Sequence, residues 1–267
     1  MTEPAIQAVT VNFKVAVGDG SFDASVDVPE GECNLTGLLP ALQSLDQALL
    51  SAVAEPLGAA GLSISCKAGC GACCRQMVPL SIFEAEALAA WIATLGPDMR
   101  QALAQRFHQA LLKLAAGGLI DRLVTGDWLA ETESARHLAL DYFYQGVPCP
   151  FLQDESCSIH PIRPLVCREY LVTSDPRHCA DPRTLQVDPV GLPTRLSRTL
   201  YRMGAELEPG SYGWIPLVFL FAWMESGAHP GAAFHGTGPE VLYEFVKRME
   251  FERKPTRAPS GPGTSPT

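Results

Sequence analysis

Nine cysteines are the feature that most restricts how this chain of 267 residues can fold. Eight of them fall into two blocks, and the ninth, Cys33, stands apart. The first block holds Cys66, Cys70, Cys73 and Cys74, and the second holds Cys149, Cys157, Cys167 and Cys179. A chain of this length can bury a hydrophobic core without disulfide bonds, so its clustered cysteines indicate metal ligation. Disulfide bonds and ordinary core cysteines are the alternatives.

Composition and charge narrow the class of protein. The first residues, MTEPAIQAVTVNF, lack the basic and continuous apolar segments of a secretory signal, so we expect a cytoplasmic protein with reduced thiols. The net charge of −9, from 20 basic and 29 acidic residues, argues against nucleic-acid binding. The longest apolar run, 214–224, is too short for a membrane span and is interpreted as a buried helix.

Hydrophobic patterning predicts a mainly α (α+β) protein with a β-hairpin near its N-terminus. Apolar residues alternate with polar or small ones over 9–17 and again over 22–28, with a glycine-containing turn between them. Leucines and alanines over 36–59 then predict a helix that is interrupted near Pro56.

Further helices are expected on both sides of the second cysteine block. A capping box at Ser81 and Glu84 predicts one helix start. Pro97 and Gly117 bound another helix, which we expect to bury an apolar face that includes Met99. Other helical patterns cover 119–144 with a break near 125–127, 193–207, 214–224 and 239–251.

The second cysteine block differs in amino-acid composition from these helices. Six prolines between residues 148 and 182 exclude long helices and predict an irregular loop that lies over the helical part. We therefore divide the chain into an N-terminal β-hairpin and helix extension (1–60), a helical cysteine-cluster metal-binding domain (61–251) and a disordered tail (252–267), which is rich in Pro, Gly, Ser and Thr.

The first cysteine block is specific for metal binding. Its four cysteines within nine residues would share a sector of about 100° on a helix, or one tight knuckle if the glycines form a turn. The second block is weaker evidence alone, but a loop pinned by prolines can bring its cysteines to the first. Basic residues near both blocks favour an anionic thiolate centre, although they could also be ordinary surface residues: Lys67, Arg75, Arg163, Arg168 and Arg177.

The cysteine spacing indicates which metal is bound less directly than it indicates metal binding. Zinc ribbons usually present two C-x-x-C knuckles, and this chain has one, at Cys70 and Cys73. The adjacent Cys73 and Cys74 favour a multinuclear iron–sulfur cluster, most simply a 4Fe–4S cluster, or two neighbouring sites. Zinc is the alternative. His160 and His178 stand beside cysteines and are candidate ligands, with hydrogen-bonding or surface roles as the alternative.

The combined motif resembles a known family. C-x-x-x-C-x-x-C-C at 66–74, followed by CPFL at 149–152, CSIH at 157–160 and RPLVCREY at 163–170, is similar to the putative zinc- or iron-chelating domain family, also called YkgJ-like cysteine-cluster proteins. The resemblance covers about Cys66 to Cys179, under half of the chain, and implies metal chelation by these cysteines. A flagellin lysine methylase carries a related cluster.

Three functions are consistent with this pattern. The protein is an iron–sulfur redox enzyme or electron carrier, a zinc-binding structural or metal-handling protein that acts through a protein partner, or, as the methylase implies, an enzyme that modifies a protein or a small metabolite. No P-loop, dinucleotide fingerprint, serine nucleophile elbow or S-adenosylmethionine fingerprint occurs, so no catalytic residue is assigned and enzyme activity stays open. Acidic pairs such as Glu84 and Glu86 are interpreted as solvated.

Overall fold

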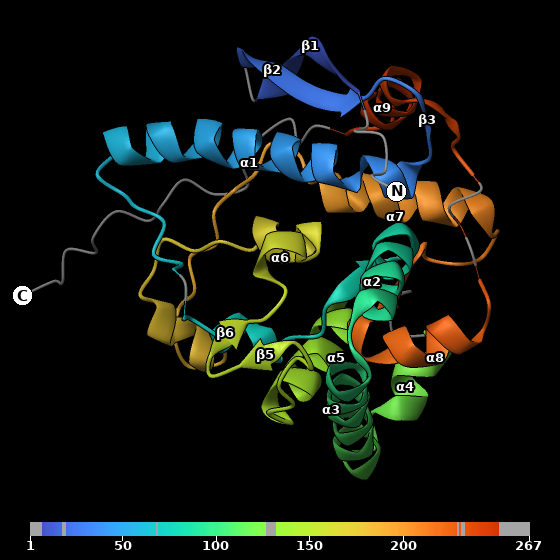
Figure 1. Cartoon of the computed structure of the whole chain (residues 1–267). Coiled ribbons are helices and arrows are strands. Elements are labelled where there is room, and N and C mark those ends of the chain that lie inside the picture. Colours follow the sequence, from blue (N-terminus) through green and yellow to red (C-terminus); the bar gives the residue numbers. More distant parts are fainter. Residues whose placement is uncertain are drawn as a thin grey trace, which may run out of the picture.

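The computed structural model describes residues 7–17, 20–67, 69–126, 132–228, 230 and 233–250. It shows a mainly α protein with small antiparallel strand pairs and an N-terminal hairpin, as predicted (Figure 1). The predicted disordered tail, 252–267, lies outside the described residues. In chain order the elements are β1 (Ala8–Val17), β2 (Gly20–Pro29), β3 (Glu32–Cys33), α1 (Leu35–Ala59), η1 (Ala72–Arg75), β4 (Pro79–Ser81), α2 (Ile82–Thr94), α3 (Pro97–Ala116), α4 (Ile120–Thr125), α5 (Thr132–Tyr144), β5 (Leu152–Gln153), β6 (Ser156–Cys157), η3 (His160–Ile162), α6 (Leu165–Glu169), η4 (Pro176–Ala180), α7 (Leu196–Leu207), β7 (Trp214–Pro216), η5 (Leu217–Phe219), α8 (Leu220–Glu225), β8 (Gly236–Thr237) and α9 (Gly238–Val246).

The N-terminal hairpin follows the predicted alternation. β1 pairs antiparallel with β2, with Val15 opposite Phe22. The side chains of Ala24, Val26 and Val28, two residues apart, are all buried, because successive strand residues point to opposite faces and this face lies toward the helices. The turn residues at 18–19 lie outside the described residues.

The long helix α1 runs through Pro56 without the predicted interruption. Pro56 lacks the N–H that would continue the helical hydrogen bonding, but it stands in the last turn. The following turn still closes, because the Ala60 N–H donates to the carbonyls of Pro56 and Leu57. At the other end Asn34 caps the helix by accepting a hydrogen bond from the Gly37 N–H at 2.8 Å.

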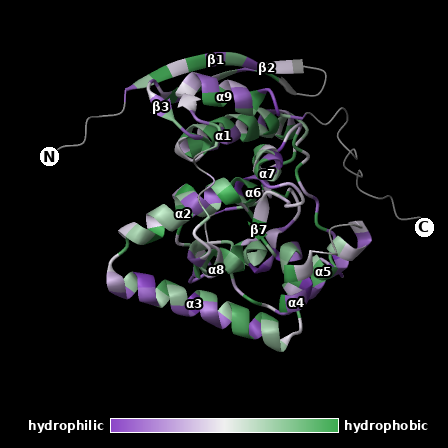
Figure 2. Cartoon of the chain, turned by 90° about the vertical axis from the view of Figure 1, so that its right-hand side faces the viewer, coloured by the Kyte–Doolittle hydropathy of each residue, from purple (hydrophilic) through white to green (hydrophobic). Residues whose placement is uncertain are grey.

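An upper core joins the hairpin to α1, α7 and α9. Figures 1 and 2 both place the hairpin above α1, with α6 and α7 beneath it. The buried apolar side chains of this upper core are Val15, Ala24, Val26, Val28, Leu35, Leu38, Leu39, Ala41, Leu42, Leu45, Leu49, Phe83, Leu165, Leu196, Leu200, Met203, Val241, Leu242, Phe245 and Met249.

A lower core is built by α2, α3, α5 and α8 with the loops around them. The predicted capping box is present: the Ser81 hydroxyl accepts from the Glu84 N–H, and the Glu84 carboxylate accepts from the Ser81 N–H. Figure 2 shows hydrophobic and hydrophilic residues alternating along α3, which buries Leu103 and Phe107. The prediction for Met99 is wrong. It is 59% exposed, because the first turn of α3 reaches the surface.

The apolar run at 214–224 is not one helix as predicted. Its first three residues form β7, which pairs with β4 so that Leu80 lies opposite Ile215, and α8 begins only at Leu220. The reason is Pro216, since a proline disfavours helical conformation in the residue before it. Among the described helices, none combines the length and apolar character needed to cross a membrane.

Candidate metal centre

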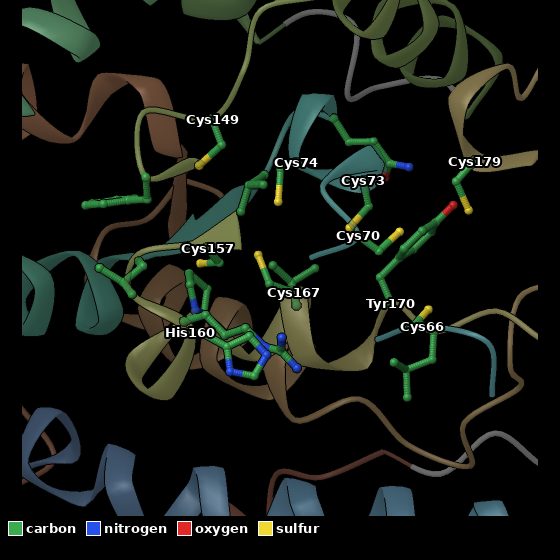
Figure 3. A pocket seen from close by; sticks show the side chains of 18 of the residues that line it. Cys66, Cys70, Cys73, Cys74, Cys149, Cys157, His160, Cys167, Tyr170 and Cys179 are labelled. Atoms are coloured by element: carbon green, nitrogen blue, oxygen red, sulfur yellow. The ribbon is translucent and has the colours of Figure 1, made fainter. Parts of the chain in front are cut away.

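A cavity of about 310 Å³ lies beside the lower core and is lined by all eight clustered cysteines (Figure 3). Cys33 lies elsewhere, in β3, where it pairs with Gly236 of β8 and packs against the upper core. Apolar side chains complete much of the cavity wall, among them Met77, Val78, Phe151 and Leu217. The structure thus brings together the two cysteine blocks that are separated by about 75 residues of helices.

The first cysteine block forms a glycine-containing knuckle rather than a continuous helix. Gly69 has a φ of +81°, which only glycine adopts freely. Gly71 is needed for space, because a Cβ there would lie 2.5 Å from a carboxylate oxygen of Glu155 and 3.2 Å from its Cα. The short 3₁₀ helix η1 then carries Cys73 and Cys74. Of the two predicted arrangements of this block, the structure has the knuckle.

Hydrogen bonds fasten the second block onto this knuckle. The Cys149 N–H donates to the Cys74 carbonyl at 2.7 Å. The Arg75 guanidinium binds Glu155 through two hydrogen bonds of 2.6 and 3.1 Å, and it also donates to the Gly71 carbonyl at 2.8 Å. The tight turn between β5 and β6 therefore sits directly on η1, and it presents Cys157 to the cavity.

Helix α6 carries Cys167 and is fixed at both ends by buried carboxylates. Glu84 of α2 accepts a hydrogen bond from the Leu165 N–H at 2.7 Å, which caps the start of α6. Glu169 at its end accepts from the Ser197 N–H at 3.0 Å and so caps α7. Glu84 is only 4% exposed, so its interpretation as a solvated residue is wrong. The capping-box spacing locates Glu84 on its helix but cannot reveal a second partner 81 residues away.

Burial keeps most of these thiols protonated in the absence of a metal. It raises the pKa of Cys149 to about 12 and that of Cys179 to about 11. A hydrogen bond from the Cys74 thiol lowers the pKa of Cys73 to about 7 and raises the pKa of Cys74 itself. Burial also raises the pKa of Cys66, Cys157 and Cys167. A metal must displace these protons, so metal affinity rises with pH.

The predicted basic residues divide into two groups. Lys67 and Arg163 line the cavity. The positive charge of Arg163 acts to lower the pKa of Cys66, Cys73 and Cys157, and its buried Nε–H has no hydrogen-bond partner within the described part of the chain. The other predicted cations make bonds elsewhere: Arg75 to Glu155, Arg168 to the carbonyls of Pro161 and Arg163, and Arg177 to Asp175.

The two candidate histidines differ in their position relative to the cavity. His160 lines the cavity, and burial together with Arg163 and Arg168 lowers its pKa, which favours the neutral imidazole that binds metals. His178 instead lies with its Nδ1 at 2.7 Å from the Gln186 carbonyl. Tyr170 is a lining residue that the pattern did not single out: its ring extends among Cys66, Cys70 and Cys179, and its hydroxyl bonds Gln76 (Figure 3).

The chemistry of this site fits a thiophilic metal centre. Eight sulfur donors surround one cavity, and the guanidinium of Arg163 in its wall provides a cation for the negative charge that thiolates would bring. In the arrangement of the described residues, no three His, Cys, Asp or Glu side chains are close enough together to hold one ion. The sulfur atoms nevertheless point into the cavity from its walls (Figure 3).

Fold and site together define a mainly α protein with a cysteine-lined candidate metal centre. Residues 65–184, somewhat under half of the chain, match the family model CxxCxxCC, described as a putative zinc- or iron-chelating domain. The match supports metal binding and spans the resemblance predicted from the sequence. No curated protein and no solved structure matches the chain.

Proposed function

We propose that the cysteine cavity holds an iron–sulfur centre and that the protein takes part in a redox or modifying reaction. The observation that carries this proposal is the placement of eight thiols around a single cavity of about 310 Å³. A zinc ion needs no such space, because four sulfurs close around it at about 2.3 Å. A cluster with its own sulfide ions takes up a volume that cysteine side chains surround.

Backbone hydrogen bonds to sulfur support the proposal. The Val172 N–H donates to Cys66 Sγ at 3.4 Å. The N–H groups of Phe151 and Ile159 likewise bond to the sulfurs of Cys149 and Cys157. Such bonds stabilise negative charge on sulfur, and they set the reduction potential of iron–sulfur clusters. Arg163 adds a positive charge to the same wall.

A zinc-binding structural or metal-handling protein is the second candidate. The observation that favours it is the architecture of the cysteine-bearing segments, which consist of short elements such as η3, α6 and η4. Segments with so little regular structure gain stability when a metal joins them, and zinc does this in many small domains.

Metal and sulfide analysis of protein purified without oxygen tests the proposal. We expect iron and acid-labile sulfide in similar amounts, broad visible absorption that bleaches on reduction, and an electron paramagnetic resonance signal in one redox state. The Cys33→Ser variant is the matched control and should keep the full metal content, since Cys33 lies outside the cavity. A colourless protein that retains zinc would contradict the iron–sulfur proposal and establish the second candidate.

A further inference from the structure

We infer that the eight cysteines form two separate four-sulfur centres and that the adjacent Cys73 and Cys74 belong to different ones. The inference deepens the proposed function and rests on the metal binding proposed there. The first, named the Cys70 centre, consists of Cys66, Cys70, Cys73 and Cys179. The second, named the Cys167 centre, consists of Cys74, Cys149, Cys157 and Cys167.

The arrangement of the sulfurs carries this division. Figure 3 shows Cys74, Cys149, Cys157 and Cys167 around one end of the cavity, and Cys66, Cys70, Cys73 and Cys179 toward the other.

Electrostatic interactions between the thiols are consistent with the same division for every cavity cysteine except Cys73, which interacts with both groups. Cys179 interacts with Cys66 and Cys70. At the opposite end Cys74 interacts with Cys149 and Cys157, as does Cys167.

The backbone explains why neighbouring cysteines separate. Cys73 and Cys74 lie on the 3₁₀ helix η1, where successive side chains diverge by about 120° because the helix has three residues per turn. The Cys74 carbonyl is bonded to the Cys149 N–H, which holds this residue next to the second block. The Cys73 sulfur lies between the Cys74 sulfur, with which it shares a hydrogen bond, and the Cys70 sulfur (Figure 3).

Cys73 is the residue that decides between one centre and two. It interacts with thiols of both groups, including Cys66 and Cys179 on one side and Cys149 on the other. We assign it to the Cys70 centre, because four other cysteines gather at the opposite end of the cavity and the remaining three lack a fourth sulfur (Figure 3). The C-x-x-C spacing from Cys70 to Cys73 is also that of a metal knuckle.

The two centres have different surroundings. Cys149 and Cys157 of the Cys167 centre pack against the buried lower core. The Cys70 centre lies against the exposed loop that carries Lys67 and Gly69, with Tyr170 beside it. Since solvent and chelators reach an exposed loop first, the Cys70 centre should release its metal earlier than the Cys167 centre.

Metal counting on single-cysteine variants tests the division. The probe is zinc(II) or cobalt(II) alone, added to the full-length reduced chain, with metal per chain measured by mass spectrometry and sulfur ligation by X-ray absorption. We expect two metals in the unsubstituted protein, each with four sulfur neighbours. Cys70→Ser and Cys73→Ser should each lose one metal, Cys74→Ser and Cys157→Ser should each lose the other, and Cys33→Ser should lose none.

Two results of this experiment would contradict the division into two centres. If Cys73→Ser removed both metals, or if the unsubstituted chain bound one metal that every cavity cysteine variant abolished, the eight thiols would form a single centre while metal binding stood. If the chain bound neither zinc, nor cobalt, nor iron supplied together with sulfide, the proposal that the cavity binds a metal would be wrong. A chain that holds two zinc ions and no iron would contradict only the iron–sulfur proposal.

A second measurement avoids variants that fail to fold. The metal-loaded, unsubstituted protein is mixed with a chelator, and newly freed thiols are alkylated and located by peptide mass spectrometry at successive times. We expect Cys66, Cys70, Cys73 and Cys179 to become reactive together in an early phase, followed by the four cysteines of the Cys167 centre. Reaction of all eight at one rate would overturn the division.

Discussion

The upper core and the cysteine-bearing segments are stabilised in different ways. In the upper core, regular elements interlock through apolar side chains such as Leu38, Leu42 and Phe245, which are almost completely buried. Each such side chain contributes about 1.5–3 kcal/mol of transfer free energy. The cysteine-bearing segments, 65–75 and 149–180, hold few buried apolar residues and rely on hydrogen bonds, the Arg75–Glu155 ion pair and, as we propose, a metal.

The two regions meet at buried acidic side chains. Asp46 of α1 is 2% exposed, and its Oδ2 has no hydrogen-bond partner among the described residues. Glu84 and Glu169 hold the ends of α6. Apolar packing can therefore keep the upper core folded while the cysteine loops depend on ligands. Hydrogen bonds of Glu84 and Glu169 at the two ends of α6 connect the two regions.

The largest effect is expected from removing the metal. A chelator under reducing conditions should raise amide hydrogen exchange strongly in 65–75 and 149–180, because structural metal sites contribute about 10 kcal/mol. The hairpin and α1 should keep their protection. Hydrogen-exchange mass spectrometry of metal-loaded and stripped protein measures both. Equal loss of protection in the hairpin would contradict the comparison.

Core truncation should show the opposite pattern. Leu42→Ala removes a fully buried side chain from the upper core and should lower the free energy of unfolding by about 3–5 kcal/mol. Metal content per folded chain should stay unchanged, since Leu42 does not line the cavity. Chemical denaturation and metal analysis of the same sample test this. A parallel loss of metal would mean that the two regions fold as one unit.

The link between the regions can be weakened at Glu84. Glu84→Ala leaves the N–H groups of Ser81 and Leu165 without their buried partner and should lower the free energy of unfolding by about 1–3 kcal/mol. Metal should also bind more weakly, because α6 with Cys167 loses its anchor.

Glu240→Ala is the matched control for this change. Glu240 belongs to the same kind of capping box, with Thr237, but at an exposed site on α9. Its removal should have a smaller effect on stability and none on metal affinity. If both variants bound metal as the unsubstituted chain does, Glu84 would be a cap of α2 alone.

The last prediction concerns the pH dependence of stability and leaves the metal centre unchanged. Burial, with Glu169 nearby, raises the pKa of Asp46 to about 8. Because the unfolded carboxyl titrates near pH 3.9, the folded chain holds more protons between about pH 4 and 8, and this group costs stability as pH rises through that window. Asp46→Asn should therefore make the free energy of unfolding less dependent on pH in this window, by up to about 1.4 kcal/mol per pH unit. Unfolding of both chains at several pH values measures it, and identical slopes would contradict a buried neutral Asp46.

Much of the fold could be predicted because its signals are local. Alternating apolar residues define the hairpin, the Ser81–Glu84 spacing defines the start of α2, and Pro97 and Gly117 bound α3. The predictions failed where a long-range partner decided the outcome. Pro216 ends the helical pattern locally, but the pairing of Trp214–Pro216 with β4 and the hydrogen bond from the Leu165 N–H to Glu84 involve partners distant in the sequence.

The sequence by itself determined that this protein carries a dense thiol motif on a mainly α scaffold, and it identified the cysteines that now line one cavity. Residue type and spacing suffice for that, since they are properties of a single short segment. That the two blocks line one cavity follows from the tertiary structure, because 74 residues lie between Cys74 and Cys149. Their meeting depends on backbone bonds between distant loops and on the direction in which a 3₁₀ turn points two adjacent side chains.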